Sequence, residues 1–144
     1  MRKLKRIIAV ALAAMLVLSS AALADNMFGV QPRVDAYFMS CVCKIEIKSG
    51  RVYTISISAY ATGKMTMLGA TSVEIYKNGK YLKTFKYTDD GRTGLMQRNV
   101  TSMSDSESTT GVSGASYYAK VHFYAKNSAG TGTKTMTTKT ITLS

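Results

Sequence analysis

The sequence contains no tryptophan, a single proline, Pro32, and a single histidine, His122. A zinc site with four ligands would need partners beyond this histidine and the two cysteines. A serine hydrolase would show a Gly-x-Ser-x-Gly motif, which is also missing. We therefore expect no catalytic residues, no cofactor and no metal, and we interpret His122 as a surface residue of a protein that is not an enzyme.

Long apolar runs are missing except near the N-terminus. Four cations precede the apolar residues 7–18, and small residues ending in Ala22-Leu23-Ala24 follow them. This order is that of a secretory signal peptide, and the run is shorter than the roughly 20 residues that span a bilayer. We predict a helical signal peptide over residues 1–24, cleavage between Ala24 and Asp25, and a secreted, extracellular protein without a stable membrane anchor.

Acidic residues are scarce as well, with eight Asp and Glu against 19 Lys and Arg. Removing residues 1–24 takes away four cations and leaves 15 against eight, a net charge of about +7 on 120 residues, enough for one domain. The cations are spread along the chain, so we expect no nucleic-acid partner. The charge favours an acidic cell-wall polymer, a glycan or a surface protein, or it serves solubility alone.

Alternating apolar and polar residues dominate the rest of the chain. Residues 25–35 show no period and are predicted to be an irregular segment that leads into a domain over residues 36–144. Strands are predicted over residues 37–47, 51–62, 117–127 and 133–143, with one polar strand near 103–110 and a Met-rich link over 65–70. About seven antiparallel strands without an amphipathic helix predict an all-β sandwich.

Asn78-Gly79 lies between two alternating runs and predicts a hairpin with a type I′ turn. A two-residue turn pairs Lys77 with Lys80, Tyr76 with Tyr81, Ile75 with Leu82, and Glu74 with Lys83. With Ile75 and Leu82 facing the core, Tyr76, Tyr81 and Phe85 are expected to face outward.

Cys41 and Cys43 share the strand parity of Ile45, so we predict buried thiols that pack as small hydrophobic groups. A disulfide between them is disfavoured, because residues i and i+2 of a strand lie about 6.6 Å apart, near the limit for bridging. A disulfide to another chain and a metal site remain alternatives. Asp89-Asp90-Gly91 and Asp105-Ser106-Glu107 are predicted to be solvated turns, since neither has the ligand run of a calcium loop.

Residues 125–130, Ala-Lys-Asn-Ser-Ala-Gly, follow an alternating strand and resemble the end of strand F and the F to G turn of fibronectin type III and related immunoglobulin-like sandwiches. Tyr117 corresponds to the aromatic residue of strand F in such domains, displaced by two positions. Residues 55–63, 68–76 and 118–125 together resemble a family of small secreted proteins of Gram-positive bacteria. The resemblances imply an exported bacterial protein with a divergent sandwich fold, and no activity.

In a fibronectin-like order, strand F lies beside the predicted hairpin, so outward side chains of both gather on one face. We predict that this face binds a ligand through Tyr76, Tyr81, Lys83, Tyr118, Lys120 and Tyr124. Aromatic faces with polar rims hold sugar rings, and the cations suit an acidic polymer.

The same aromatic pairs also stabilise a sheet without any ligand. Two functions therefore remain open at this point. One is a non-catalytic extracellular binding module for a cell-surface glycan or protein. The other is a structural or self-associating protein that uses its Thr-rich final strand as a pairing edge.

Overall fold

Residues 36–144 are described by the structure, a computed structural model of the chain. The predicted signal peptide, its cleavage position between Ala24 and Asp25, and the irregular segment 25–35 lie outside the described residues. Within residues 36–144, helical structure is confined to one 3₁₀ turn, η1 (Thr93–Leu95).

Nine strands make up most of this domain. They are β1 (Phe38–Ser49), β2 (Val52–Met65), β3 (Met67–Lys77), β4 (Lys80–Lys86), β5 (Met96–Gln97), β6 (Val100–Thr110), β7 (Ser116–Asn127), β8 (Gly130–Thr137) and β9 (Ile141–Thr142). Strands β5 and β9 have only two residues each, and the other seven have seven or more. The seven long strands agree with the number predicted from the alternation.

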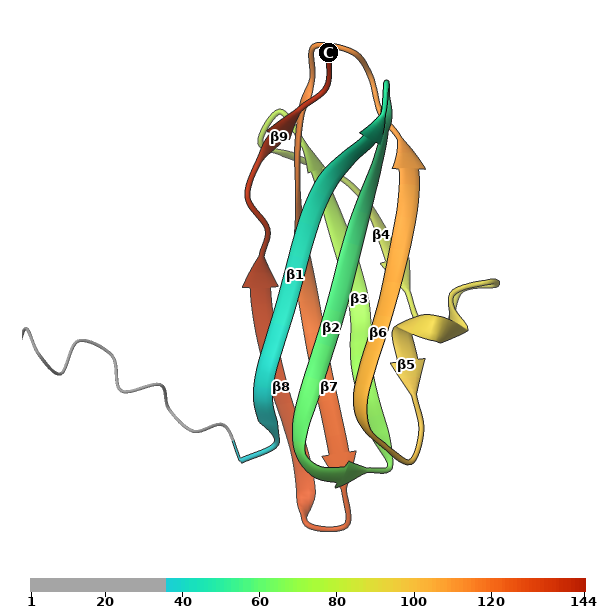
Figure 1. Ribbon diagram of the computed structural model, residues 1–144, viewed down its shortest axis with the longest axis vertical. Coiled ribbons are helices and arrows are strands. Elements are labelled where there is room, and N and C mark those ends of the chain that lie inside the picture. The colour runs from blue at the N-terminus through green and yellow to red at the C-terminus, as the bar shows by residue number, and fades with distance from the viewer. Residues whose placement is uncertain (1–35) are drawn as a thin grey trace, which may run out of the picture. The chain divides into compact units, whose positions relative to one another are not determined.

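The strands form two antiparallel sheets that lie face to face (Figure 1). One sheet has the order β1-β2-β6, and the other has the order β4-β3-β7-β8, with β5 beside β3 and β9 beside β7. All pairings are antiparallel. The protein is therefore all-β, as the sequence predicted.

The core lies between the two sheets and is formed by the apolar residues of the alternating strands. In β2 the inward residues are Tyr53, Ile55, Ile57, Ala59 and Ala61, and in β7 they are Tyr117, Ala119, Val121, Phe123 and Ala125. Every one of them is less than 9% exposed. Because successive strand residues point to opposite faces, the intervening Ser, Thr, Lys and Tyr residues are left on the outside.

Two large aromatic side chains, Tyr53 and Tyr117, pack against each other in the core. The rings of Tyr53 and Tyr117 are both buried, with their centroids 4.8 Å apart. The Tyr117 hydroxyl also accepts a hydrogen bond of 2.9 Å from the backbone N–H of Val112, five residues upstream. Tyr117 thereby fastens the start of β7 to the connection that follows β6.

The predicted Met-rich link over residues 65–70 is wrong, because β3 already begins at Met67. Strand β2 ends at Met65, and Thr66 alone separates it from β3 in the other sheet. Leu68 and Ala70 are fully buried, so this stretch is core strand. Gly69 is required here, since a Cβ at this position would clash with the carbonyl oxygen of Leu95.

The predicted hairpin is confirmed at its turn, but its predicted register fails beyond the second pair. Asn78 and Gly79 have φ angles of 49° and 77°, as a type I′ turn requires. Lys77 pairs with Lys80 and Tyr76 with Tyr81, but a bulge then places Ile75 opposite Lys83 and Glu74 opposite Thr84.

The bulge moves three side chains of β4 away from their expected places. Leu82, predicted to face the core, is 46% exposed. Phe85, predicted to face outward, packs against the core opposite Val73. Lys83, which was predicted to face outward, pairs with the buried Ile75 and therefore lies on the inward side of β4. An extra residue in one strand reverses the faces of all residues that follow it.

The predicted last strand over residues 133–143 is interrupted. β8 ends at Thr137 and β9 begins at Ile141, and both pair with β7. Thr138 occupies the break, where its hydroxyl accepts a hydrogen bond from the Ala119 N–H and donates one to the Lys139 carbonyl. The Thr138 hydroxyl takes the place of a backbone carbonyl as the acceptor. The Ala119 N–H of β7 therefore stays hydrogen-bonded at the break.

Candidate functional site

Three tyrosines form a row across β4, β3 and β7 on the outer face of the larger sheet. The Tyr76 and Tyr118 rings are stacked, with centroids 4.7 Å apart and planes 4° from parallel. Tyr81 meets Tyr76 edge-on at 6.0 Å and is 60% exposed. We call Tyr76, Tyr81 and Tyr118 the tyrosine row.

Charged groups border the tyrosine row on β3 and β7. The Lys120 ammonium lies 4.9 Å from the centroid of the Tyr76 ring, within the range of a cation–π interaction. The Tyr76 hydroxyl donates a hydrogen bond of 2.9 Å to Glu74 Oε2. This hydrogen bond, more than burial or the neighbouring charges, raises the pKa of Tyr76. Glu74 thus fixes the Tyr76 ring in the orientation that stacks on Tyr118.

His122 continues the same network on the outer face of β7. Its Nδ1 lies 3.0 Å from the hydroxyl of Thr135 on β8. Its Nε2 is buried and lies 3.2 Å from Glu74 Oε1, outside hydrogen-bonding geometry. The imidazole is thus held between β3 and β8, with the Thr135 hydroxyl beside one ring nitrogen and the Glu74 carboxylate beside the other.

Two of the predicted site residues lie apart from the tyrosine row. Tyr124 is on the same face of β7 opposite Gly69, six residues from Tyr118, which is about 20 Å at about 3.3 Å per residue. Lys83 points away from this face, because of the bulge after Tyr81. The structure therefore brings together four of the six predicted residues, Tyr76, Tyr81, Tyr118 and Lys120.

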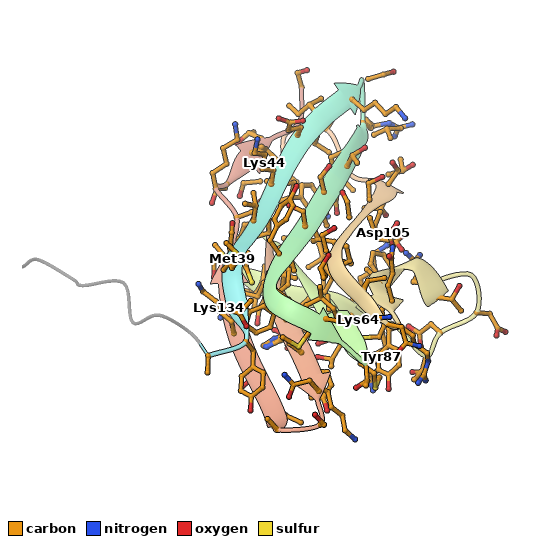
Figure 2. All side chains as sticks on the ribbon, turned by 60° about the horizontal axis from the view of Figure 1, so that its bottom comes forward. Met39, Lys44, Lys64, Tyr87, Asp105 and Lys134 are labelled. Atoms are coloured by element: carbon orange, nitrogen blue, oxygen red, sulfur yellow. The ribbon has the colours of Figure 1, made fainter. Side chains whose placement is uncertain are left out.

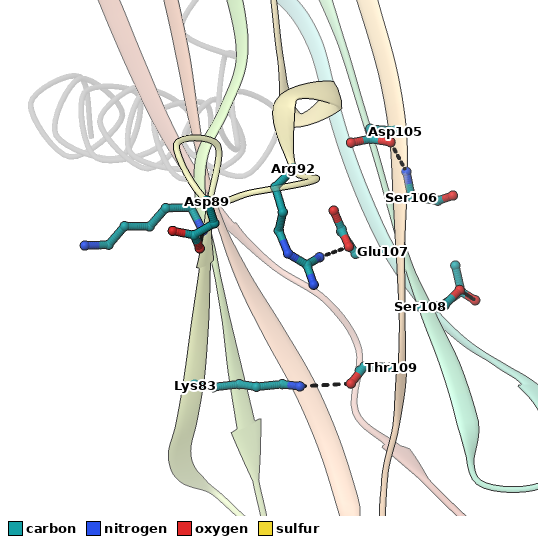
Figure 3. A network of polar contacts seen from close by, with 10 residues as sticks. Lys83, Asp89, Arg92, Asp105, Ser106, Glu107, Ser108 and Thr109 are labelled. Carbon is teal, nitrogen blue, oxygen red and sulfur yellow. Dashed lines mark hydrogen bonds and ion pairs between the residues drawn. The ribbon is translucent and has the colours of Figure 1, made fainter.

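Lys83 instead belongs to a polar network that joins the two sheets (Figure 3). Its ammonium donates a hydrogen bond of 2.9 Å to the Thr109 hydroxyl of β6. Arg92, from the loop before η1, forms an ion pair with Glu107 of the same strand. Both cations also lie over the Phe85 ring, at 4.7 Å for Lys83 and 3.7 Å for Arg92.

This network, which we call the seam, takes the place of apolar contacts between β4 and β6. Burial lowers the pKa of Lys83, and the neighbouring Arg92 lowers it further. Asp105 lies between β6 and the η1 loop (Figure 2), against Gly94. The prediction of a solvated turn at Asp105-Ser106-Glu107 is therefore wrong, because these residues are in β6 and two of them face the seam.

Cys41 and Cys43 both face the core side of β1, as predicted, and no disulfide joins them. Cys41 is buried, whereas Cys43 is half-buried and lines a hollow of about 390 Å³ with Lys44, Glu46 and Lys139. Burial raises the pKa of the Cys43 thiol, which disfavours the reactive thiolate. Among residues 36–144 no three His, Cys, Asp or Glu side chains are grouped as metal ligands would be.

The outer face of the β1-β2-β6 sheet was missed by the sequence analysis. Its central residues are Thr54, Ser56 and Ser58 on β2 and Ser104, Ser106 and Ser108 on β6. Their alternation was used only to assign strands, although two alternating hydroxyl runs are themselves a signal of a hydroxyl-rich face. We call these six residues the hydroxyl ladder.

Comparison with known proteins gives no relative for this chain: no family model, no curated protein and no solved structure matches it. In the described part of the chain, no helix has the length and apolar character needed to cross a membrane.

Proposed function

We propose that this chain is a secreted, non-catalytic bacterial binding module that presents the tyrosine row and Lys120 to an acidic cell-wall glycan. The observation that carries the proposal is the parallel stack of Tyr76 on Tyr118, with a cation over one ring and the exposed Tyr81 beside it. Binding requires no titrating nucleophile or cofactor.

The proposal includes a divergent fibronectin type III or immunoglobulin-like identity for the sandwich. Tyr117 supports it, since a tyrosine near the start of strand F that bonds to the backbone a few residues upstream is a feature of such domains. The position of β7 beside the β3–β4 hairpin supports it as well, because this is the neighbour that the resemblance implied for strand F.

The chemistry of the row suits an acidic sugar polymer. Aromatic rings offer an apolar surface to the C–H face of a sugar ring, and Lys120 offers a positive charge next to it. Glu74 keeps Tyr76 fixed through the hydrogen bond to its hydroxyl. A surface that is ordered before binding loses less conformational entropy when the ligand arrives.

The test is retention of the purified protein on isolated Gram-positive cell walls, before and after chemical extraction of their anionic polymers. Tyr81→Ala and Lys120→Met are each expected to weaken retention on intact walls by about tenfold, equivalent to about 1.4 kcal/mol. Extraction of the anionic polymers from the walls should weaken the retention of the native protein to a similar extent.

Tyr124→Ala is the matched control, because it removes a tyrosine from the same strand and face about 20 Å from the row. Its retention should equal that of the native protein. Equal losses in all three variants, or retention unchanged in Tyr81→Ala and Lys120→Met, would sink the proposal.

The alternative function, self-association, is favoured by one observation. Strand β8 lies at the end of its sheet and pairs only with β7 among the described strands, so its other edge is available to a second copy. Growth of particle size with concentration in light scattering, abolished by Thr135→Pro, would favour this alternative over the wall-binding role.

A further inference from the structure

The hydroxyl ladder lies on the side of the sandwich opposite to the tyrosine row. Ser58 is directly opposite Ser104, Ser56 is opposite Ser106, and Thr54 is opposite Ser108. All six side chains point outward, since the residues between them on β2 are core residues such as Ile55 and Ile57. Two parallel columns of hydroxyls therefore cover one face.

Most of these hydroxyls keep their hydrogen-bonding capacity. Thr54 and Ser108 are joined by a hydrogen bond of 2.9 Å between their hydroxyls. In residues 36–144, no such bond joins Ser56 to Ser106 or Ser58 to Ser104. Since each hydroxyl can donate one hydrogen bond and accept two, the unused groups favour a ligand that offers both donors and acceptors.

A hollow of about 170 Å³ opens on the unbonded half of the ladder. Ser56, Ser58 and Ser104 line it together with Val42 and Lys44 from the exposed side of β1. Tyr60 follows Ser58 at the next outward position of β2, opposite Ser102, and is 53% exposed. Three hydroxyls thus border a space that is small on the scale of ligand pockets, and the exposed Tyr60 ring lies at the next outward position beyond it.

Charge selects among the partners that such a surface could hold. The two hydroxyl columns carry no charge, and on β1 Lys44 is followed at the next outward position by Glu46. An acidic polymer gains little here. A second copy of the chain is also disfavoured, because stable protein interfaces need an apolar centre, whereas the centre of this face is the hydroxyl ladder.

We propose that Tyr60 and the adjoining half of the hydroxyl ladder form a second binding site, which takes a neutral polysaccharide. Tyr60 stacks on the apolar face of one sugar ring, and the hydroxyls of Ser56, Ser58 and Ser104 exchange hydrogen bonds with those of the next ring. The site is independent of the tyrosine row in position, in charge and in the type of polymer it selects.

The experiment is retention of the full-length protein on two insoluble neutral polysaccharides, cellulose and a (1→3)-β-glucan, at low and high salt. The native protein should be retained on at least one of them equally at both salt concentrations, because no ion pair contributes. Tyr60→Ala and Ser58→Val should each weaken that retention by about tenfold.

Thr54→Val is the matched control on the same strand and face, since Thr54 lies outside the hollow and valine keeps its shape. Tyr81→Ala is the control for the tyrosine row. Both should bind neutral polysaccharide as the native protein does, and thermal unfolding of each variant checks that it is folded.

Several results would overturn the proposal. They are no retention on either polymer, retention lost at high salt, and folded Tyr60→Ala and Ser58→Val variants that bind as the native protein does. Concentration-dependent association that Tyr60→Ala abolishes would instead make a second copy the occupant of this face. None of these results depends on whether the tyrosine row binds cell walls.

Discussion

At the scale of single residues, the hydroxyl of Tyr117 ties the connection between β6 and β7 to a core side chain. The Val112 N–H has this hydroxyl as its acceptor, at 2.9 Å. The ring itself is buried against Tyr53. A substitution that removes only the hydroxyl therefore removes the hydrogen bond and keeps the packing of the ring.

Tyr117→Phe is expected to lower the free energy of unfolding by about 1–2 kcal/mol, the usual cost of leaving a partly buried donor without its acceptor. Urea unfolding followed by circular dichroism measures the change. Tyr118→Phe, one residue along on the outer face, is the control and should change stability by less than about 0.5 kcal/mol. Equal effects would show that the hydroxyl of Tyr117 contributes nothing specific.

Tyr53 makes stability depend on pH in the alkaline range. Burial, with a smaller effect from Tyr117, raises the pKa of Tyr53 from 10.0 to about 12. Below about pH 10, both the folded and unfolded states keep the phenol proton. Between about pH 10 and 12 the unfolded state loses it first, so stability falls as the pH rises, by on the order of 2–3 kcal/mol. Urea unfolding across this range should show a smaller fall in Tyr53→Phe.

At the scale of elements, the β3–β4 hairpin depends on one glycine. Gly79 has a φ of 77°, which an L-residue adopts at a cost, although nothing lies within 4 Å of a Cβ placed there. Gly79→Ala is therefore expected to destabilise the domain by about 1 kcal/mol through the backbone alone.

Gly63→Ala provides the control, since a Cβ at Gly63 also meets nothing within 4 Å and its φ is not positive. It should leave stability unchanged or raise it by up to about 1 kcal/mol, because alanine restricts the unfolded chain. Both variants are compared by thermal unfolding. A loss of similar size in both would contradict the role of the turn conformation.

At the scale of the whole molecule, the two sheets are held together by the apolar core between them. The seam adds polar contacts where their edge strands β4 and β6 meet. The Arg92–Glu107 pair is only partly exposed, with 25% and 14% of the side chains accessible. Breaking it also releases Arg92 from the Phe85 ring. The loop before η1 would then lose this ion pair with β6.

Glu107→Gln is expected to destabilise the domain by about 1 kcal/mol, and high salt should reduce the difference from the native protein, because salt screens the ion pair. Glu46→Gln, an exposed glutamate on β1, is the matched control and should have little effect. Unfolding in urea at low and high salt makes the comparison. A difference that does not respond to salt would assign the loss to packing.

The sequence by itself determined most of the strands, the type I′ turn and the alternation of apolar and polar residues along β2 and β7, because alternation and Asn-Gly are local signals. It also placed Tyr76, Tyr81 and Tyr118 on one face. Only the tertiary structure decided that Leu82 is bulged, that Lys83 and Glu107 face the seam, and that Ser58 and Ser104 border a hollow beside Tyr60. Bulges and contacts between sheets depend on strands distant in the sequence, which no local pattern records.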